Sequence, residues 1–249
     1  MAKQDGILQI KGTLDNLTFY KSEDGYLVKK KSGVSKNRIK RASTFVRTRE
    51  NGREFKECAV SAGMLRKAVG LFVLKAKDRR LSSRMVALFS QIKTKDSTSV
   101  RGERTIAKGL LATEGKELLK GFDFNARAPL ASVLSSPIGL VSATGVVSIT
   151  DLIPAEQLRI PMGATHFSLQ CAYLNLDFAT GLYEVCYSPT SVFVIDDTVV
   201  HPTLTPVSVP VGVGVKLYFF LIVFSQEVNG THYALHNGAH NVLHLLEVL

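Results

Sequence analysis

Apolar side chains recur at alternating steps of three and four residues along the segment 44–74. This spacing places them on one face of an α-helix, and it predicts a long amphipathic helix that packs against another surface. Ser43 or Thr44 can cap this helix, because a hydroxyl there accepts a hydrogen bond from an unpaired backbone N–H. Three internal glycines weaken the helix by about 1 kcal/mol each relative to alanine, which packing must offset. The apolar positions are Phe55, Cys58, Ala62, Leu65, Val69 and Phe72.

Two further helical patterns follow this main helix. The same spacing over about 81–95 predicts a second helix. The stretch 103–120 is also helical in pattern, but Gly109 and Gly115 interrupt it, so we expect two short pieces. The apolar positions of the second helix are Leu81, Met85, Leu88, Phe89 and Ile92.

Short apolar runs separated by turn residues predict a small β-meander over residues 6–32. Asp15-Asn16 separates two of the runs, and Asp24-Gly25 lies between two tyrosines as a hairpin-turn dipeptide. Two or three strands of this length are marginally stable alone. We therefore expect the meander to pack on another element, with the main helix as its partner.

Residues 128–249 show alternating apolar runs that turn residues break at short intervals. About seven short strands over this length predict an antiparallel β-sandwich of immunoglobulin-like size. The chain has no Trp, so it lacks the Cys…Trp…Cys pattern of true immunoglobulin domains. The predicted fold class is α+β, with one domain over 1–127 and a second over 128–249. The clearest strand segments are 166–173, 183–187, 191–195, 216–226, 233–236 and 242–249.

The two halves of the chain carry opposite net charge. Residues 1–127 contain 29 of the 31 Lys and Arg and 13 of the 21 Asp and Glu, a net charge of +16. Residues 128–249 contain 2 basic and 8 acidic residues, a net charge of −6. A basic half favours an anionic partner, and an acidic half in the same chain makes a second copy one such partner. Head-to-tail contacts of this kind close into rings or continue as filaments.

The basic charge is densest in the segment 29–43, which predicts an arm or linker. Residues 29–41 contain seven basic residues and no acidic one. Such a segment neutralises phosphates, or it is a solvated linker. It lacks the interleaved aromatic side chains that stack on bases, which disfavours sequence-specific or single-strand readout. The candidate anion- or partner-binding residues are Lys29, Lys30, Lys31, Lys36, Arg38, Lys40, Arg41, Arg47 and Arg49.

Four C-terminal histidines form the pattern closest to a metal site. His232, His236, His240 and His244 recur every four residues, which on one helix would align them. Asn237-Gly238 is a turn signal in the middle of this pattern, and a hairpin there places two histidines on each sheet face. We therefore predict no bound metal and no cofactor.

Other catalytic and targeting signals are also missing from the sequence. It contains no Gly-rich phosphate loop, nucleophile elbow or HExxH motif, so no enzymatic activity is predicted. Its three cysteines lack metal-site spacing and are expected as free thiols. No secretory leader and no apolar run of about 18 residues is present, which predicts a cytoplasmic protein without membrane insertion.

Several phrases of the chain lie in turns and at the start of the main helix. They are Gly12-Thr-Leu-Asp-Asn-Leu-Thr-Phe-Tyr-Lys21, Asp24-Gly-Tyr26, Gly33-Val-Ser-Lys36, Phe45-Val-Arg-Thr-Arg-Glu-Asn51 with Glu54-Phe55, Gly121-Phe-Asp-Phe-Asn125, and Gln226-Glu-Val-Asn-Gly230 with Asn237-Gly238. Together they resemble an uncharacterised family of proteins from Gram-negative bacteria, a domain family of unknown function. The resemblance covers most of the chain and implies a bacterial protein without a signal peptide. It implies no activity, ligand or catalytic residue.

These features favour a non-enzymatic structural or interaction protein. We expect it to form a homo-oligomer, with the basic helical half of one subunit against the acidic β half of another. The alternative is a nucleic-acid-associated protein that uses residues 29–49 as a non-specific phosphate-binding segment. A third interpretation is a metal protein or enzyme that uses the C-terminal histidines.

Overall fold

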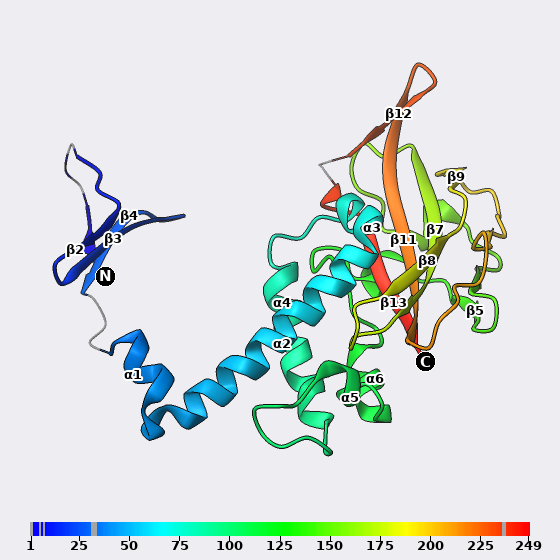
Figure 1. Ribbon diagram of the computed structural model, residues 1–249. Helices are drawn as coiled ribbons and strands as arrows, with labels where there is room; N and C mark the ends of the chain where they lie inside the picture. Colours follow the sequence, from blue (N-terminus) through cyan, green and yellow to red (C-terminus); the bar gives the residue numbers. More distant parts are fainter. Residues whose placement is uncertain (1, 5, 7, 31–33, 236–237) are drawn as a thin grey trace. The chain divides into compact units, whose positions relative to one another are not determined.

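The computed structural model spans the whole chain and describes all residues except 1, 5, 7, 31–33, 236 and 237 (Figure 1). Contacts divide the chain into two compact units, Met1–Glu50 (the N-terminal unit) and Asn51–Leu249 (the C-terminal unit). The predicted α+β class is confirmed: a four-stranded antiparallel meander is followed by helices and then by a curled antiparallel sheet. The described residues contain no helix long and apolar enough to cross a bilayer.

The N-terminal unit contains the predicted meander, whose strands lie in the order β1-β4-β3-β2. The turn at Asp15-Asn16 is confirmed, and Asp15 has a φ of 51°. In the next hairpin Gly25 pairs with Ser22, so Glu23 and Asp24 form the loop between the strands. The strands are β1 (Ala2–Lys3), β2 (Gly12–Leu14), β3 (Leu17–Ser22) and β4 (Gly25–Lys30).

Helices make up most of residues 36–119. The predicted main helix is interrupted at Val69, where the backbone leaves helical geometry one residue before Gly70. The region 103–120 forms two short helices, as predicted. In chain order the helices are α1 (Lys36–Arg41), η1 (Ser43–Phe45), α2 (Val46–Ala68), α3 (Gly70–Lys75), α4 (Leu81–Ile92), η2 (Lys93–Lys95), α5 (Ile106–Gly109) and α6 (Thr113–Leu119).

The apolar stripe of the main helix is buried except at its first position. Phe55 is 61% exposed, although the periodicity placed it with the core residues. At this turn of α2 the buried position is occupied by Glu54, whose carboxylate binds Lys93 and the backbone N–H of Gly102. In the first turn of α2 within the C-terminal unit, the buried contact is therefore the polar one made by Glu54.

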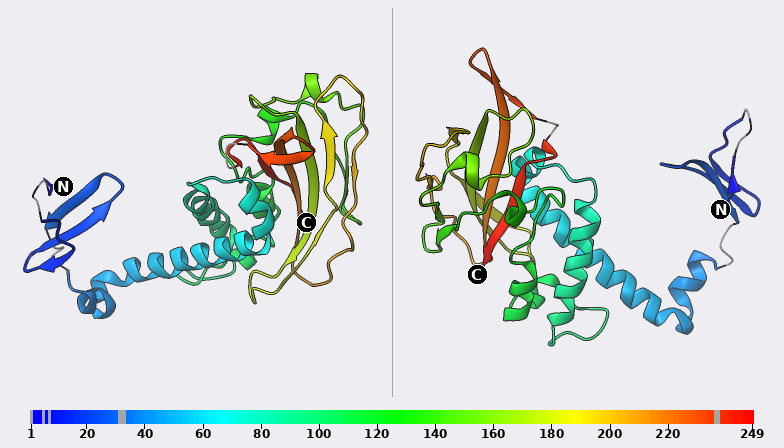
Figure 2. Two further views of the ribbon diagram at one scale, coloured as in Figure 1. Left: turned by 90° about the horizontal axis from the view of Figure 1, so that it is seen from above. Right: turned by 180° about the vertical axis from the view of Figure 1, so that it is seen from behind.

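The C-terminal unit is built on a six-stranded antiparallel sheet that curls into half a barrel (Figure 2). Its two central strands, β7 and β11, pair along the whole of β7. On the outer edge of β11, β12 and β13 follow one another, and on the outer edge of β7 lie β8 and β9. The strands are β7 (His166–Leu176), β8 (Tyr183–Tyr187), β9 (Ser191–Val194), β11 (Val215–Val228), β12 (Thr231–Ala234) and β13 (Val242–Val248).

Both faces of this sheet are buried, which gives two hydrophobic cores. Alternate residues of β11 point to opposite faces: Phe219 packs with the helices, and Phe220 packs in the second core. The second core lies under a three-stranded sheet and two short helices. These are β5 (Gly139–Val141), β6 (Val146–Ser148), β10 (Thr203–Leu204), α7 (Leu130–Val133) and α8 (Pro154–Gln157).

The helices of residues 51–127 therefore share a core with the sheet, in contrast to the predicted sandwich domain over 128–249. A strand that is buried on both faces has a continuous apolar run, as in residues 217–224, in place of strict alternation. The change in net charge between residues 1–127 and 128–249 does not coincide with a boundary between compact units. The contacts instead divide the chain between Glu50 and Asn51.

Candidate functional site

The predicted basic segment begins at the end of β4. Lys29 and Lys30 are the last two residues of β4, and both are exposed. The Lys29 ammonium lies 5.3 Å from the centroid of the Tyr20 ring, a cation–π contact that directs it along the sheet. Lys31 lies outside the described residues.

The middle of the segment forms the helix α1, where the sequence predicted an arm or linker. Ser35 caps this helix, because its hydroxyl oxygen accepts a hydrogen bond from the Arg38 backbone N–H at 3.3 Å. The helix has no buried residue. Four cations are therefore exposed within one short helix: Lys36, Arg38, Lys40 and Arg41.

The last two candidates bind other parts of the N-terminal unit. Arg49 Nη1 donates hydrogen bonds to the carbonyl oxygens of Ile39 and Ala42, both at 2.9 Å. Arg49 thus joins α1 to α2 and has a structural role. Arg47 Nη1 lies 2.9 Å from Glu50 Oε2, an exposed pair worth a few tenths of a kcal/mol.

The sheet of the N-terminal unit is almost without a core. Among the described residues of this unit, Leu27 is the only buried side chain. A domain of about 50 residues needs most of its apolar surface covered to be stable. The meander thus leaves apolar side chains uncovered: Leu14 and Leu17 are paired across β2 and β3, and Leu8 and Ile10 are exposed in the segment before β2.

A second exposed apolar surface lies on the C-terminal unit, along the outer edge of β7. The segment 205–213 runs beside β8, where the Val207 N–H donates to the Tyr187 carbonyl oxygen at 3.1 Å. The Val211 N–H donates to Glu184 Oε2 at 2.6 Å. We call this surface the valine edge; its exposed members are Leu182, Tyr183, Val192, Val194, Val207, Val209, Val211 and Val213.

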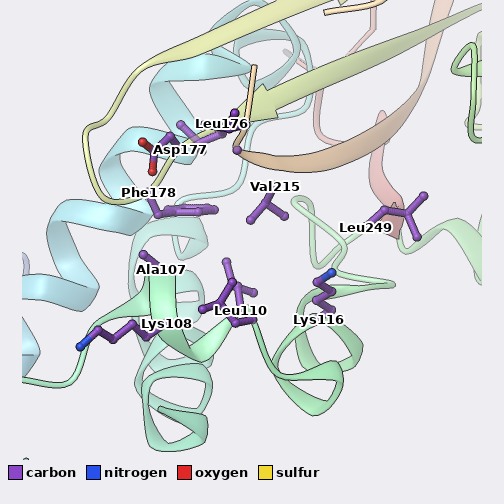
Figure 3. Close-up of a pocket in the computed structure, with 12 residues that line it drawn as sticks. Ala107, Lys108, Leu110, Lys116, Leu176, Asp177, Phe178, Val215 and Leu249 are labelled. Carbon is purple, nitrogen blue, oxygen red and sulfur yellow. The ribbon is translucent and has the colours of Figure 1, made fainter. Parts of the chain in front are cut away.

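A cleft of the C-terminal unit lies between α5, α6 and the ends of β7 and β11 (Figure 3). Its lining is mostly apolar and includes Leu110, Phe178 and Val215. The Asp177 carboxylate accepts from the Ala179 N–H at 2.8 Å and the Thr180 hydroxyl at 2.6 Å. These bonds hold the β7–β8 turn and lower the pKa of Asp177. Its charge therefore organises the turn.

The four C-terminal histidines are not arranged as the predicted hairpin requires. Because β12 and β13 both pair with β11, they lie end to end along one strand. His244 Nδ1 lies 2.7 Å from Asp123 Oδ1, which also accepts from the Leu130 N–H at 3.0 Å. His236 lies outside the described residues.

His232 instead joins two residues that the sequence analysis did not select, His166 and Glu227. His166 Nε2 lies 3.1 Å from Glu227 Oε2. The His166 and His232 rings meet edge to face, with centroids 4.8 Å apart. No spacing signal could reveal this cluster, because His166 is far from the others in sequence and only the pairing of β7 with β11 unites them.

Comparison of the chain with protein-family models, with curated proteins and with solved structures gives no match.

Proposed function

We propose that this protein is a non-enzymatic interaction protein that assembles with copies of itself. The uncovered apolar sheet of the N-terminal unit carries this proposal. With Leu27 as its one buried described residue, the sheet gains little stability from within, and a protein surface that covers it would supply the missing burial. The valine edge of a second copy is the occupant to which we assign it.

Two properties of the valine edge support this pairing. Exposed apolar surfaces of this kind mark protein–protein interaction sites. The charges are also complementary: the N-terminal unit holds 12 basic and 5 acidic residues, while residues 160–215 hold four acidic residues and no Lys or Arg. Two different surfaces that meet form a head-to-tail contact, which builds a ring or a filament.

A mixing experiment tests the proposal on the full-length protein by light scattering on a sizing column. Leu14→Asp with Leu17→Asp disables the sheet, and Val211→Asp with Val213→Asp disables the valine edge. We expect the wild type to be oligomeric and each double variant to be monomeric. Their equimolar mixture should form a 1:1 heterodimer, because one intact sheet then meets one intact valine edge.

The control for this experiment is Val100→Asp, an exposed valine in the loop before α5 and outside both surfaces, which should leave the oligomer unchanged. A monomeric wild type would contradict self-assembly. A mixture that stays monomeric would show that the two surfaces do not meet each other.

A second candidate function is non-specific binding to nucleic acid, supported by the four exposed cations of α1. When the logarithm of the binding constant is plotted against the logarithm of the salt concentration, each phosphate contact adds about 0.9 to the steepness of the fall. We expect Lys36→Glu, Arg38→Glu and Lys40→Glu together to reduce this slope by about 2 to 3 in fluorescence anisotropy with duplex DNA. The charge-matched control replaces three exposed cations outside α1 with glutamate: Lys77, Arg79 and Arg80. Equal losses in the two triple variants would exclude α1 as the binding element.

A further inference from the structure

We infer that His166, Glu227 and His232 form a binding site for a divalent transition-metal cation, with Zn²⁺ the best match. This inference is independent of self-assembly. It begins with the sheet register: His166 is paired with Ser225, and Glu227 is paired with His232. Because side chains alternate between faces, these three neighbouring strands present all three side chains on one face.

The three side chains already lie close to metal-ligand spacing. One ligand atom from each can be chosen so that all three lie within 4.8 Å of one another. Two ligands bonded to zinc at tetrahedral angles are about 3.3 Å apart, since Zn–N and Zn–O bonds are about 2.0–2.1 Å. The 3.1 Å between His166 Nε2 and Glu227 Oε2 is near this value. His232 is exposed on β12, and a side-chain rotation brings its imidazole to the cation.

A hydrogen bond behind His166 orients the ring for this role. His166 Nδ1 lies 2.9 Å from Thr165 Oγ1, and the same oxygen accepts from the Glu227 N–H at 2.8 Å. The oxygen has a second lone pair, so it can also accept from Nδ1–H, and that tautomer leaves the Nε2 lone pair for a cation. Such bonds behind a ligating histidine fix its tautomer and ring orientation.

The chemistry of the donor set selects among cations. Two imidazoles and one carboxylate suit Zn²⁺ and its neighbours in the first transition series, whereas Ca²⁺ and Mg²⁺ prefer oxygen ligands alone. Three protein ligands leave a fourth tetrahedral position for water or another ligand. The three side chains are reachable from solvent, because His166 is half-buried and the other two are exposed.

Zinc titration calorimetry of the full-length, chelator-treated protein tests this site. We expect one Zn²⁺ per chain, with affinity reduced at least tenfold in His166→Ala, Glu227→Gln and His232→Ala. Thr165→Val should also weaken binding about 10- to 100-fold, because the ring loses its orienting partner. Co²⁺ bound in place of Zn²⁺ should give the visible absorption of a four-coordinate site, and the same variants should lose it.

The matched control is His201→Ala, an exposed histidine whose Nδ1 lies 3.7 Å from Asp151 Oδ1. It should leave stoichiometry and affinity unchanged. All variants are monitored by circular dichroism, and because these side chains lie at the surface we expect them to fold. No zinc binding by the wild type would overturn the inference. So would zinc binding that survives in all three ligand variants, since the cation would then lie elsewhere.

Discussion

Replacing Glu54 with alanine is expected to lower the free energy of unfolding of the C-terminal unit by about 3–5 kcal/mol. The Glu54 side chain is 4% exposed, and its two oxygens bind the Lys93 ammonium and the Gly102 N–H, the latter at 2.7 Å. These bonds tie α2 to η2 and to the loop before α5. Without the carboxylate, the largely buried Lys93 ammonium loses its partner, which is the costly part of the change.

Chemical denaturation of Glu54→Ala, Glu54→Gln and a control measures this effect. The glutamine should cost less than the alanine, because its amide oxygen can still accept from Gly102. The control is Glu103→Ala, a neighbouring exposed carboxylate, expected within about 0.5 kcal/mol of the wild type. An alanine variant as stable as this control would show that the buried pair adds nothing to stability.

The same comparison has a predicted pH dependence. Desolvation acts to raise the pKa of Glu54, but the bonds from Lys93 and Gly102 outweigh it, and the net pKa lies below the usual 4.5. A lowered folded-state pKa gives stability that is present above the unfolded-state value and is lost as pH falls through the folded-state value. The difference between wild type and Glu54→Gln should therefore be largest at neutral pH and shrink below about pH 4.5.

The second large effect is expected at Gly115. A Cβ at this position would lie 2.0 Å from the Gly109 carbonyl oxygen and 2.9 Å from the Gly109 carbonyl carbon. Gly109 is itself close to α4, since its Cβ would lie 2.4 Å from the Ile92 carbonyl oxygen. Backbone atoms cannot move aside as a side-chain tip can, so α4, α5 and α6 must separate to admit a methyl group.

We therefore expect Gly115→Ala and Gly109→Ala each to destabilise the protein by about 1–3 kcal/mol or more. The control is the same substitution in α2, Gly52→Ala, where no described atom beyond its own helix and chain neighbours lies within 4 Å of the new Cβ. That variant should gain about 0.5–1 kcal/mol from helix propensity. Thermal unfolding of the three variants shows directly whether each substitution raises or lowers the stability of the protein. Stabilisation in all three would show that α5 and α6 approach less closely than the structure has them.

Local patterns predicted most of the secondary structure of this protein. The three-and-four spacing located α4 and, as one predicted helix, α2 with α3. Apolar runs bounded by turn residues located the long strands of the sheet, because both patterns depend on residues that are close in sequence. Asn229-Gly230 is a hairpin-turn dipeptide, and it forms the turn between β11 and β12 with both residues at positive φ. The break in the region 103–120 was predicted, and Gly109 is the last residue of α5, but Gly115 lies inside α6 and was wrongly assigned as an interruption. The close backbone contacts of both glycines were not foreseen.

Tertiary structure alone decided which surface covers which face. Periodicity shows that side chains share a face, but it does not identify what packs there. Phe55 therefore could not be told from Cys58 until Glu54 was seen to occupy the buried position. The pairing of β7 with β11 is likewise a long-range register, set by two cores on opposite faces of one sheet. His166 meets Glu227 and His232 only through that register, so no local pattern in the sequence could contain the cluster.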